Sequence, residues 1–185
     1  MNKISELHSV KSDTLSIVNG KVTRKPYKEL RSREYLTPDE VDLLMVAAKN
    51  LGRHGHRDQT LILIAYRHAL RVSELISLPW DMVDLKKGLV HVLRPKNGID
   101  SEHPVRGPEL RALRRLHREY PDTPYLFVTE RAGPMTDSNV RKMVKRAGEN
   151  ADIGFLIHPH MLRHSAGWSR QLVVRLLKRL RYLIV

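Results

Sequence analysis

A β-rich run flanked by helical patterns constrains this chain most. Residues 89–93, Leu-Val-His-Val-Leu, favour a strand, and the Asn97-Gly98 pair that follows is the dipeptide that tight hairpins prefer. We therefore expect a return strand near residues 101–106. The segments on either side repeat apolar residues at helical spacing instead. The sequence thus predicts an α+β fold, mostly α, in which a small antiparallel sheet is inserted in the first half of the domain.

The helical segments carry recognisable start signals. Thr37-Pro38-Asp39-Glu40 is a capping box with proline at the first helical position, and an apolar stripe at Val41, Leu44, Met45 and Ala48 follows it. Further helices are expected at about 57–70 and 108–119, after the cap at 136–139, and from Pro159 onward. Residues 125–128 are expected to form a short apolar strand.

The charge balance points to a polyanion partner. The chain has 33 Lys and Arg against 20 Asp and Glu, a formal net charge of +13. Such an excess favours nucleic acid, because neutralising phosphates releases counterions, and an acidic membrane surface is the other candidate. The absence of cysteine excludes disulfides and thiolate metal sites. No apolar run is long enough to span a membrane, so we expect a cytoplasmic protein.

Three regions are expected along the chain. Residues 1–34 show little periodicity and are predicted to be a flexible basic arm. Residues 35–167 carry the helical patterns and the hairpin, and are predicted to be one folded domain. Residues 168–185 form a basic tail without an acidic residue.

Two arginines and a histidine are predicted to carry the chemistry. Arg71 follows an apolar helix, and His160 and Arg163 lie three residues apart, which puts both on one helical face. Two guanidinium forks and a histidine could stabilise the added charge of a phosphoryl-transfer transition state. Glu74 is placed to orient Arg71, and Lys96 at the hairpin tip could protonate a leaving oxygen or contact a base. A phosphate clamp without catalysis, a structural Arg71–Glu74 pair and a solvated lysine are the alternatives.

These motifs, in this order, resemble the tyrosine recombinases of the phage integrase family, and look most similar to small fimbrial-switch invertases. The resemblance covers about residues 35–167. It implies that Arg71 and Arg163 hold the scissile phosphate, that His160 assists proton transfer, that Lys96 is the general acid and that Glu74 supports the first arginine. It further implies DNA integration or inversion without metal or cofactor, through a covalent phosphotyrosine that makes one hard step two easier ones.

The resemblance also implies double-stranded DNA as the partner, with self-association into a tetrameric synapse on it. The basic helix after residue 136 is expected to bind DNA through Arg141, Lys142, Lys145 and Arg146. After Gly167 the sequence departs from the family pattern, so the nucleophile is unknown. Tyr182 is the only tyrosine in the tail. We therefore hypothesise a truncated or frame-shifted product.

Three other functions fit parts of the sequence. A non-catalytic DNA-binding fragment that occupies recombination sites needs only the arm, the basic helix and the phosphate clamp. A zinc enzyme is suggested by His160 and His164, which are four residues apart, but Met161 stands where zinc proteases of that pattern need glutamate. A membrane-surface role of residues 168–185 would explain neither Arg71 nor Lys96.

Overall fold

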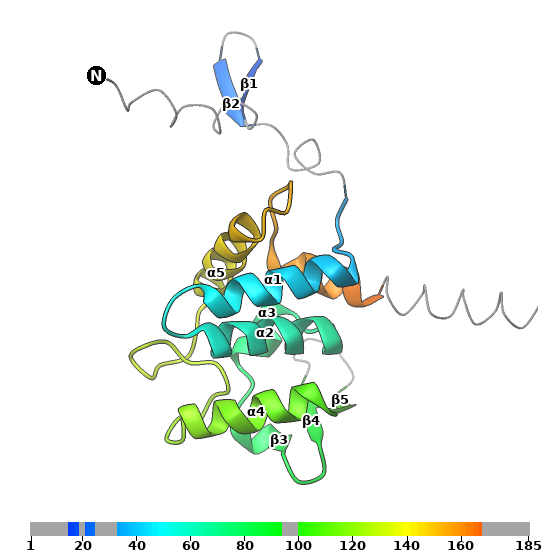
Figure 1. Ribbon diagram of the computed structural model, residues 1–185, viewed down its shortest axis with the longest axis vertical. Helices are drawn as coiled ribbons and strands as arrows, with labels where there is room; N and C mark the ends of the chain where they lie inside the picture. Colours follow the sequence, from blue (N-terminus) through cyan, green and yellow to red (C-terminus); the bar gives the residue numbers. More distant parts are fainter. Residues whose placement is uncertain (1–14, 19–20, 25–32, 94–99, 168–185) are drawn as a thin grey trace, which may run out of the picture. The chain divides into compact units, whose positions relative to one another are not determined.

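The computed structural model in Figure 1 describes residues 15–18, 21–24, 33–93 and 100–167. The chain divides into two compact units, Met1–Glu34 and Tyr35–Val185. In the first unit, β1 (Leu15–Val18) pairs antiparallel with β2 (Lys21–Arg24), with Val18 opposite Lys21. The sequence prediction of an arm did not include this hairpin. The sequence does contain a signal for the β1–β2 hairpin, namely the Asn19-Gly20 dipeptide between two runs that contain β-branched residues.

The second unit begins with two packed helices. α1 (Pro38–Asn50) starts at the expected capping box, in which the Thr37 hydroxyl accepts from the backbone N–H of Glu40. Val41, Leu44 and Ala48 of the predicted stripe are buried. α2 (Gly55–His68) packs against α1 and buries Leu61, Ile62, Ile64 and Ala65. Both helices are confirmed, because their apolar residues recur at the spacing that places them on one face.

A short helix and a small sheet follow. α3 (Val72–Ile76) and the 3-10 turn η2 (Trp80–Met82) lead into β3 (Val83–Asp84), β4 (Leu89–Val92) and β5 (Ser101–Pro104). The strands form one antiparallel sheet in the order β3-β4-β5, with Val90 opposite His103. The predicted hairpin strands are confirmed. The two-residue β3 is an addition, because so short a strand leaves no periodic signal.

The remaining helices complete the core. α4 (Pro108–Glu119) follows the sheet and packs on α2, whereas α5 (Asp137–Asn150) packs on α1. A further helix begins at Pro159, as predicted, and is described through residue 167. In Figure 1 the α1–α2 pair lies between α4 and α5. None of the helices in the described ranges is long and apolar enough to cross a membrane.

The prediction of a strand at residues 125–128 was wrong. Tyr125 and Val128 make only isolated bridges, to Pro79 and Pro134, while Leu126 and Phe127 are fully buried between them. The backbone N–H of Leu126 donates to the carbonyl oxygen of Leu78 at 3.0 Å. The run is apolar because it fills the core. It has too few consecutive ladder contacts to make a strand.

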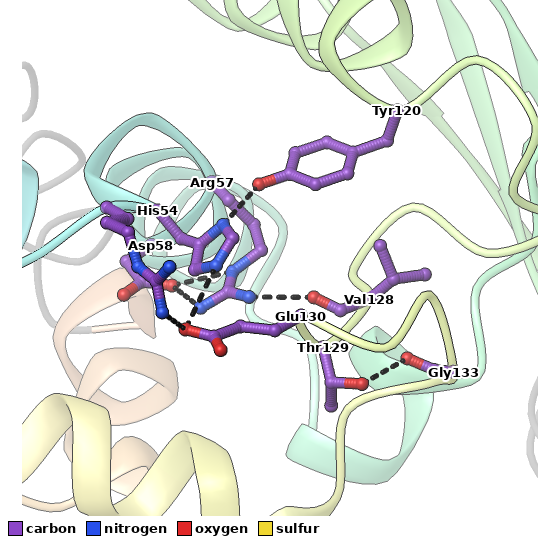
Figure 2. Close-up of polar contacts among 9 residues, drawn as sticks. His54, Arg57, Asp58, Tyr120, Val128, Thr129, Glu130 and Gly133 are labelled. Atoms are coloured by element: carbon purple, nitrogen blue, oxygen red, sulfur yellow. Dashed lines mark hydrogen bonds and ion pairs between the residues drawn. The ribbon is translucent and has the colours of Figure 1, made fainter.

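A polar cluster fixes the start of α2 to the loop at residues 128–133 (Figure 2). Arg57 and Asp58, each less than one tenth exposed, form an ion pair with Nη2 and Oδ1 2.6 Å apart. Arg57 Nη1 also donates to the Val128 carbonyl oxygen at 2.7 Å. Burial raises the pKa of Asp58, although the charge and hydrogen bonds of Arg57 oppose the shift.

Candidate phosphate-binding site

The site begins at the junction of α2 and α3. Arg71 stands at the N-cap of α3, and its backbone N–H donates to Glu74 Oε2 at 2.8 Å. Its side chain reaches the same carboxylate, with Nη1 2.7 Å from Oε1. The Glu74 side chain is only 4% exposed, whereas that of Arg71 is 56% exposed. Glu74 thus anchors one side of the guanidinium and leaves the rest accessible from solvent.

Arg163 reaches the same carboxylate from the 159–167 helix. Its Nη1 lies 3.8 Å from Glu74 Oε2 and donates to the Ala69 carbonyl oxygen at 2.9 Å. Two arginines far apart in sequence therefore share Glu74 as a common partner. Their roles toward a phosphate stay predictions.

The charge of Glu74 follows from these contacts. Burial by itself raises the pKa of this carboxyl, but the hydrogen bonds from Arg71 and the charges of Arg71 and Arg163 outweigh it. The net effect is a pKa below the ordinary glutamate value. Glu74 is accordingly ionised at neutral pH, and a buried carboxylate of this kind holds both guanidinium groups in place.

A pocket of about 260 Å³ opens beside Arg71. It brings together Arg71, His160 and Arg141, which come from α3, the 159–167 helix and α5. The full lining is Leu70, Arg71, Val72, Ser73, Asp137, Arg141, His158, Pro159 and His160. Arg163 is outside this lining, and contacts Glu74 and the Ala69 carbonyl oxygen instead. The pocket thus presents the guanidinium groups of Arg71 and Arg141 and the imidazole of His160 to one anionic group.

Two histidines, His158 and His160, line this pocket, and His164 contacts His160. The His158 and His160 rings are stacked with centroids 6.4 Å apart, and the His160 and His164 rings form a T-shaped pair with centroids 4.5 Å apart. His158 was not among the residues predicted for the site, although it directly precedes Pro159, where the helix that carries His160 begins. In the described part of the chain, no group of three His, Asp or Glu side chains is arranged to hold a metal ion.

The predicted DNA-binding residues of α5 are all exposed: Arg141, Lys142, Lys145 and Arg146. Arg141 pairs with Asp137, and Lys145 Nζ lies 3.7 Å from Glu149 Oε1. Of these four residues, only Arg141 lines the pocket beside Arg71. Lys142 and Arg146 line a different pocket, of about 340 Å³, together with Arg57 and Asp58.

Two predicted residues, Lys96 and Tyr182, lie outside the described residues, as does the tail at 168–185. The described ends of the segment that contains Lys96 are Leu93 and Asp100. Both line a pocket of about 500 Å³ to which Glu74 and His91 also contribute. The base of the β4–β5 hairpin therefore opens beside the carboxylate that anchors the arginines.

Ser165 is a positioning residue that sequence reasoning missed. Its buried hydroxyl accepts from the backbone N–H of Leu36 at 2.7 Å and donates to the Met161 carbonyl oxygen at 2.7 Å. It thus ties the 159–167 helix to the residue that precedes the α1 cap. No sequence signal gives this contact, because its partners are 129 residues apart.

The fold and the paired arginines define the catalytic domain of a tyrosine-type DNA recombinase. Residues 34–173 match the model of the phage integrase family. The type 1 fimbriae regulatory protein FimE of Escherichia coli (strain K12) is 36% identical over 146 residues, which are 76% of this chain and 73% of FimE. The chain belongs to the phage integrase family, whose enzymes cleave and rejoin DNA strands.

Solved structures show the same fold. The crystal structure of XerA recombinase superposes with a TM-score of 0.62 at 27% identity, over 76% of this chain. The matched region is 51% of that XerA chain, so this chain spans about half its length. A lambda integrase tetramer bound to a Holliday junction gives a TM-score of 0.60 at 19% identity, covering 71% of this chain and 40% of that one. The mostly helical recombinase fold predicted from the sequence is confirmed.

Proposed function

We propose that this chain acts in site-specific DNA recombination, as an integrase or invertase, by transesterification of a phosphodiester. The observation that carries the proposal is the convergence of Arg71 and Arg163 on Glu74, beside the pocket that Arg71 and His160 line. An arginine pair held by one buried carboxylate is fixed before the substrate arrives. Donors fixed in advance stabilise developing charge without reorganisation during the reaction.

The proposed reaction proceeds by two displacements at phosphorus. Arg71 and Arg163 neutralise the nonbridging oxygens of the scissile phosphate, and His160 donates a hydrogen bond to one of them. A tyrosine hydroxyl attacks phosphorus, its proton leaves to a base, and the bond to the 5′ oxygen breaks. Lys96 protonates that leaving oxygen. A 5′ hydroxyl then attacks the phosphotyrosine and restores the phosphodiester, so that no external energy source is required.

The proposed partner is double-stranded DNA, bound by its backbone along the exposed cations of α5. The lambda integrase structure is a tetramer bound to a Holliday junction, and we propose that this chain likewise self-associates on DNA. We place it in the cytoplasm, at the nucleoid, where its substrate would be. Which tyrosine is the nucleophile is part of the test, and Tyr182 is one candidate.

A trapping experiment tests the proposal. The purified chain is incubated with nicked suicide duplexes made from the genomic DNA of its source, and covalent protein–DNA adducts are separated by denaturing gel. We expect an adduct that is lost in Arg71→Ala and Arg163→Ala and kept in the control Arg131→Ala, an exposed loop arginine. Peptide mapping of the adduct identifies the tyrosine, and Tyr182→Phe checks that candidate directly.

The alternative function is a non-catalytic fragment that occupies recombination sites. It shares the arginine site and the α5 cations, and differs only in the absence of a nucleophile. Sequence-selective binding without any adduct, by wild type and by Tyr182→Phe alike, would favour this alternative over recombination.

A further inference from the structure

α4 carries a second basic surface, which the proposed reaction does not use. We define the α4 arginine face as Arg111, Arg114, Arg115 and Arg118. These positions are related by steps of three and four, so they lie on one side of the helix. All four are exposed, whereas Leu113 and Leu116 on the opposite side are fully buried. The face is therefore turned away from α2, the helix on which α4 packs.

This face opposes folding. Four pairs of like charges stand three or four residues apart along it, and each such pair destabilises a helix. Arg115 is compensated by Glu119, with Nε and Oε1 2.7 Å apart, and Arg114 donates to the Leu85 carbonyl oxygen at 3.0 Å. The side chains of Arg111 and Arg118 make no hydrogen bond or ion pair within the described part of the chain. No side-chain contact among the described residues therefore accounts for these two arginines.

The α4 arginine face is separate from the phosphate pocket. α4 packs on α2, and α5 packs on α1, so the α1–α2 pair stands between them (Figure 1). The pocket with Arg71, Arg141 and His160 involves α5 and the 159–167 helix, not α4. The pocket and the α4 arginine face are therefore formed by different elements of the domain.

We propose that the α4 arginine face binds the backbone of a second DNA segment while the first is held at the phosphate pocket. The inference rests on the proposed function, since that function makes DNA the polyanion the chain meets. Arginine favours phosphate because its planar fork grips two oxygens at once. Residues 111 to 118 span about 10 Å of helix, close to the rise of three phosphates along one strand.

A capture assay tests this inference. A biotinylated 60-base-pair duplex on beads is loaded with protein, and retention of a second, fluorescent duplex is measured. The variant Arg111→Glu/Arg118→Glu should load normally and lose at least about tenfold in capture of the second duplex. The control Lys49→Glu/Arg131→Glu changes the net charge equally at exposed sites outside α4, and should capture like wild type. Capture through self-association alone would survive the α4 change.

Salt dependence gives a second readout. Loss of two phosphate contacts should reduce the slope of log affinity against log salt for the second duplex by about 1.8. Unchanged capture and slope in Arg111→Glu/Arg118→Glu would overturn the inference. The inference would also be overturned if Arg111→Glu/Arg118→Glu still captured the second duplex but no longer bound polyglutamate. That result would assign the α4 arginine face to an acidic protein.

The adduct assay tests recombination, and the capture assay tests the second DNA site on α4. Absence of an adduct in wild type counts against recombination and leaves the capture result standing. Unchanged capture in the α4 variant counts against the second DNA site, whatever the adduct assay shows. The variant should melt no lower than wild type, because the substitution removes like-charge pairs, and this measurement excludes misfolding as the cause of lost capture.

Discussion

The Arg163 guanidinium donates a hydrogen bond to the Ala69 carbonyl oxygen, 2.9 Å away and 94 residues earlier in the chain. Ala69 caps α2 in the left-handed conformation, with φ +54° and ψ +37°. The turn that brings α2 into Arg71 therefore also supplies the acceptor that positions the second arginine. One strained backbone position serves both halves of the site.

Ala69→Gly should stabilise the fold by about 0.5–1 kcal/mol. The left-handed conformation costs an L-residue with a Cβ about 1–2 kcal/mol, of which glycine's greater loss of backbone entropy takes back a part. Urea unfolding measures the change. Ala132→Gly, at another left-handed position (φ +59°), is a control outside the site of Arg71 and Arg163 and should gain similarly. A loss of stability in Ala69→Gly alone would show that its Cβ makes packing contacts that outweigh the strain.

Arg163→Ala should impair activity far more than folding. Removing one donor to a developing oxyanion costs about 100- to 1000-fold in rate. The side chain is 28% exposed and its lost charge-assisted hydrogen bond is worth about 1.5–3 kcal/mol. Adduct yield and thermal melting are measured on the same preparation. Arg163→Lys should melt close to wild type and still fail in adduct formation, because lysine lacks the planar fork. If adduct yield and stability fell in proportion, the residue would be structural.

The Glu74 carboxylate should make stability depend on acid pH. Its pKa is lower in the folded chain than its ordinary value, so its contribution is present above about pH 4.5 and is lost as the pH falls through the folded value. Glu74→Gln should cost about 1.5–3 kcal/mol at pH 7, and the gap from wild type should narrow toward pH 3. Unfolding free energies from pH 3 to 7 measure this. A gap that stays constant with pH would mean that Glu74 acts by shape and not by charge.

Asp58→Ala should be among the most destabilising single changes, at about 3–5 kcal/mol, because it leaves the buried Arg57 charge without its partner. The double variant Arg57→Met/Asp58→Leu should lose less, since it removes both charges. Chemical denaturation of the three proteins measures the difference. A larger loss in the double variant than in Asp58→Ala would show that the Arg57 contact with Val128, and not the ion pair, holds the loop.

Asp58 should make stability depend on pH with the opposite sign to Glu74. The pKa of Asp58 is raised in the folded chain, so stability from this group is full below the ordinary aspartate value and declines as the pH rises through the folded value. Asp58→Asn should remove this decline. Unfolding free energies of wild type and variant, compared over the same acid range, test it. An unaltered profile in the variant would assign the decline to another group.

DNA binding should weaken steeply between low and physiological salt, because backbone contacts release counterions. The double variant Lys142→Ala/Arg146→Ala, both exposed on α5, should lower the slope of log affinity against log salt by about 1.8. Lys49→Ala/Arg131→Ala is the charge-matched control. Fluorescence anisotropy with a labelled duplex supplies the slopes. A slope shared by both variants would show that α5 is not a specific contact surface.

Much of the fold was predictable from local signals. The Thr37 capping box, the Pro108 and Pro159 helix starts and the hairpin strands are encoded by residues within a few positions of one another. The prediction for residues 125–128 was wrong because local signals do not decide it. A short apolar run is typical both of a strand and of a loop that fills the core. Only the packing of Leu126 and Phe127 between distant segments distinguishes the two.

For the site, the sequence by itself determined which residue types were available and in what order: two arginines, a glutamate one turn after the first, and a histidine one turn before the second. The tertiary structure alone decided that both arginines meet at one buried carboxylate, that Ala69 supplies an acceptor, and that Ser165 fastens their helix to the start of α1. Helix caps and turns are set by neighbours in sequence. The contacts of Arg163 and Ser165 join segments 90 or more residues apart, and exist only once the core between those segments has packed.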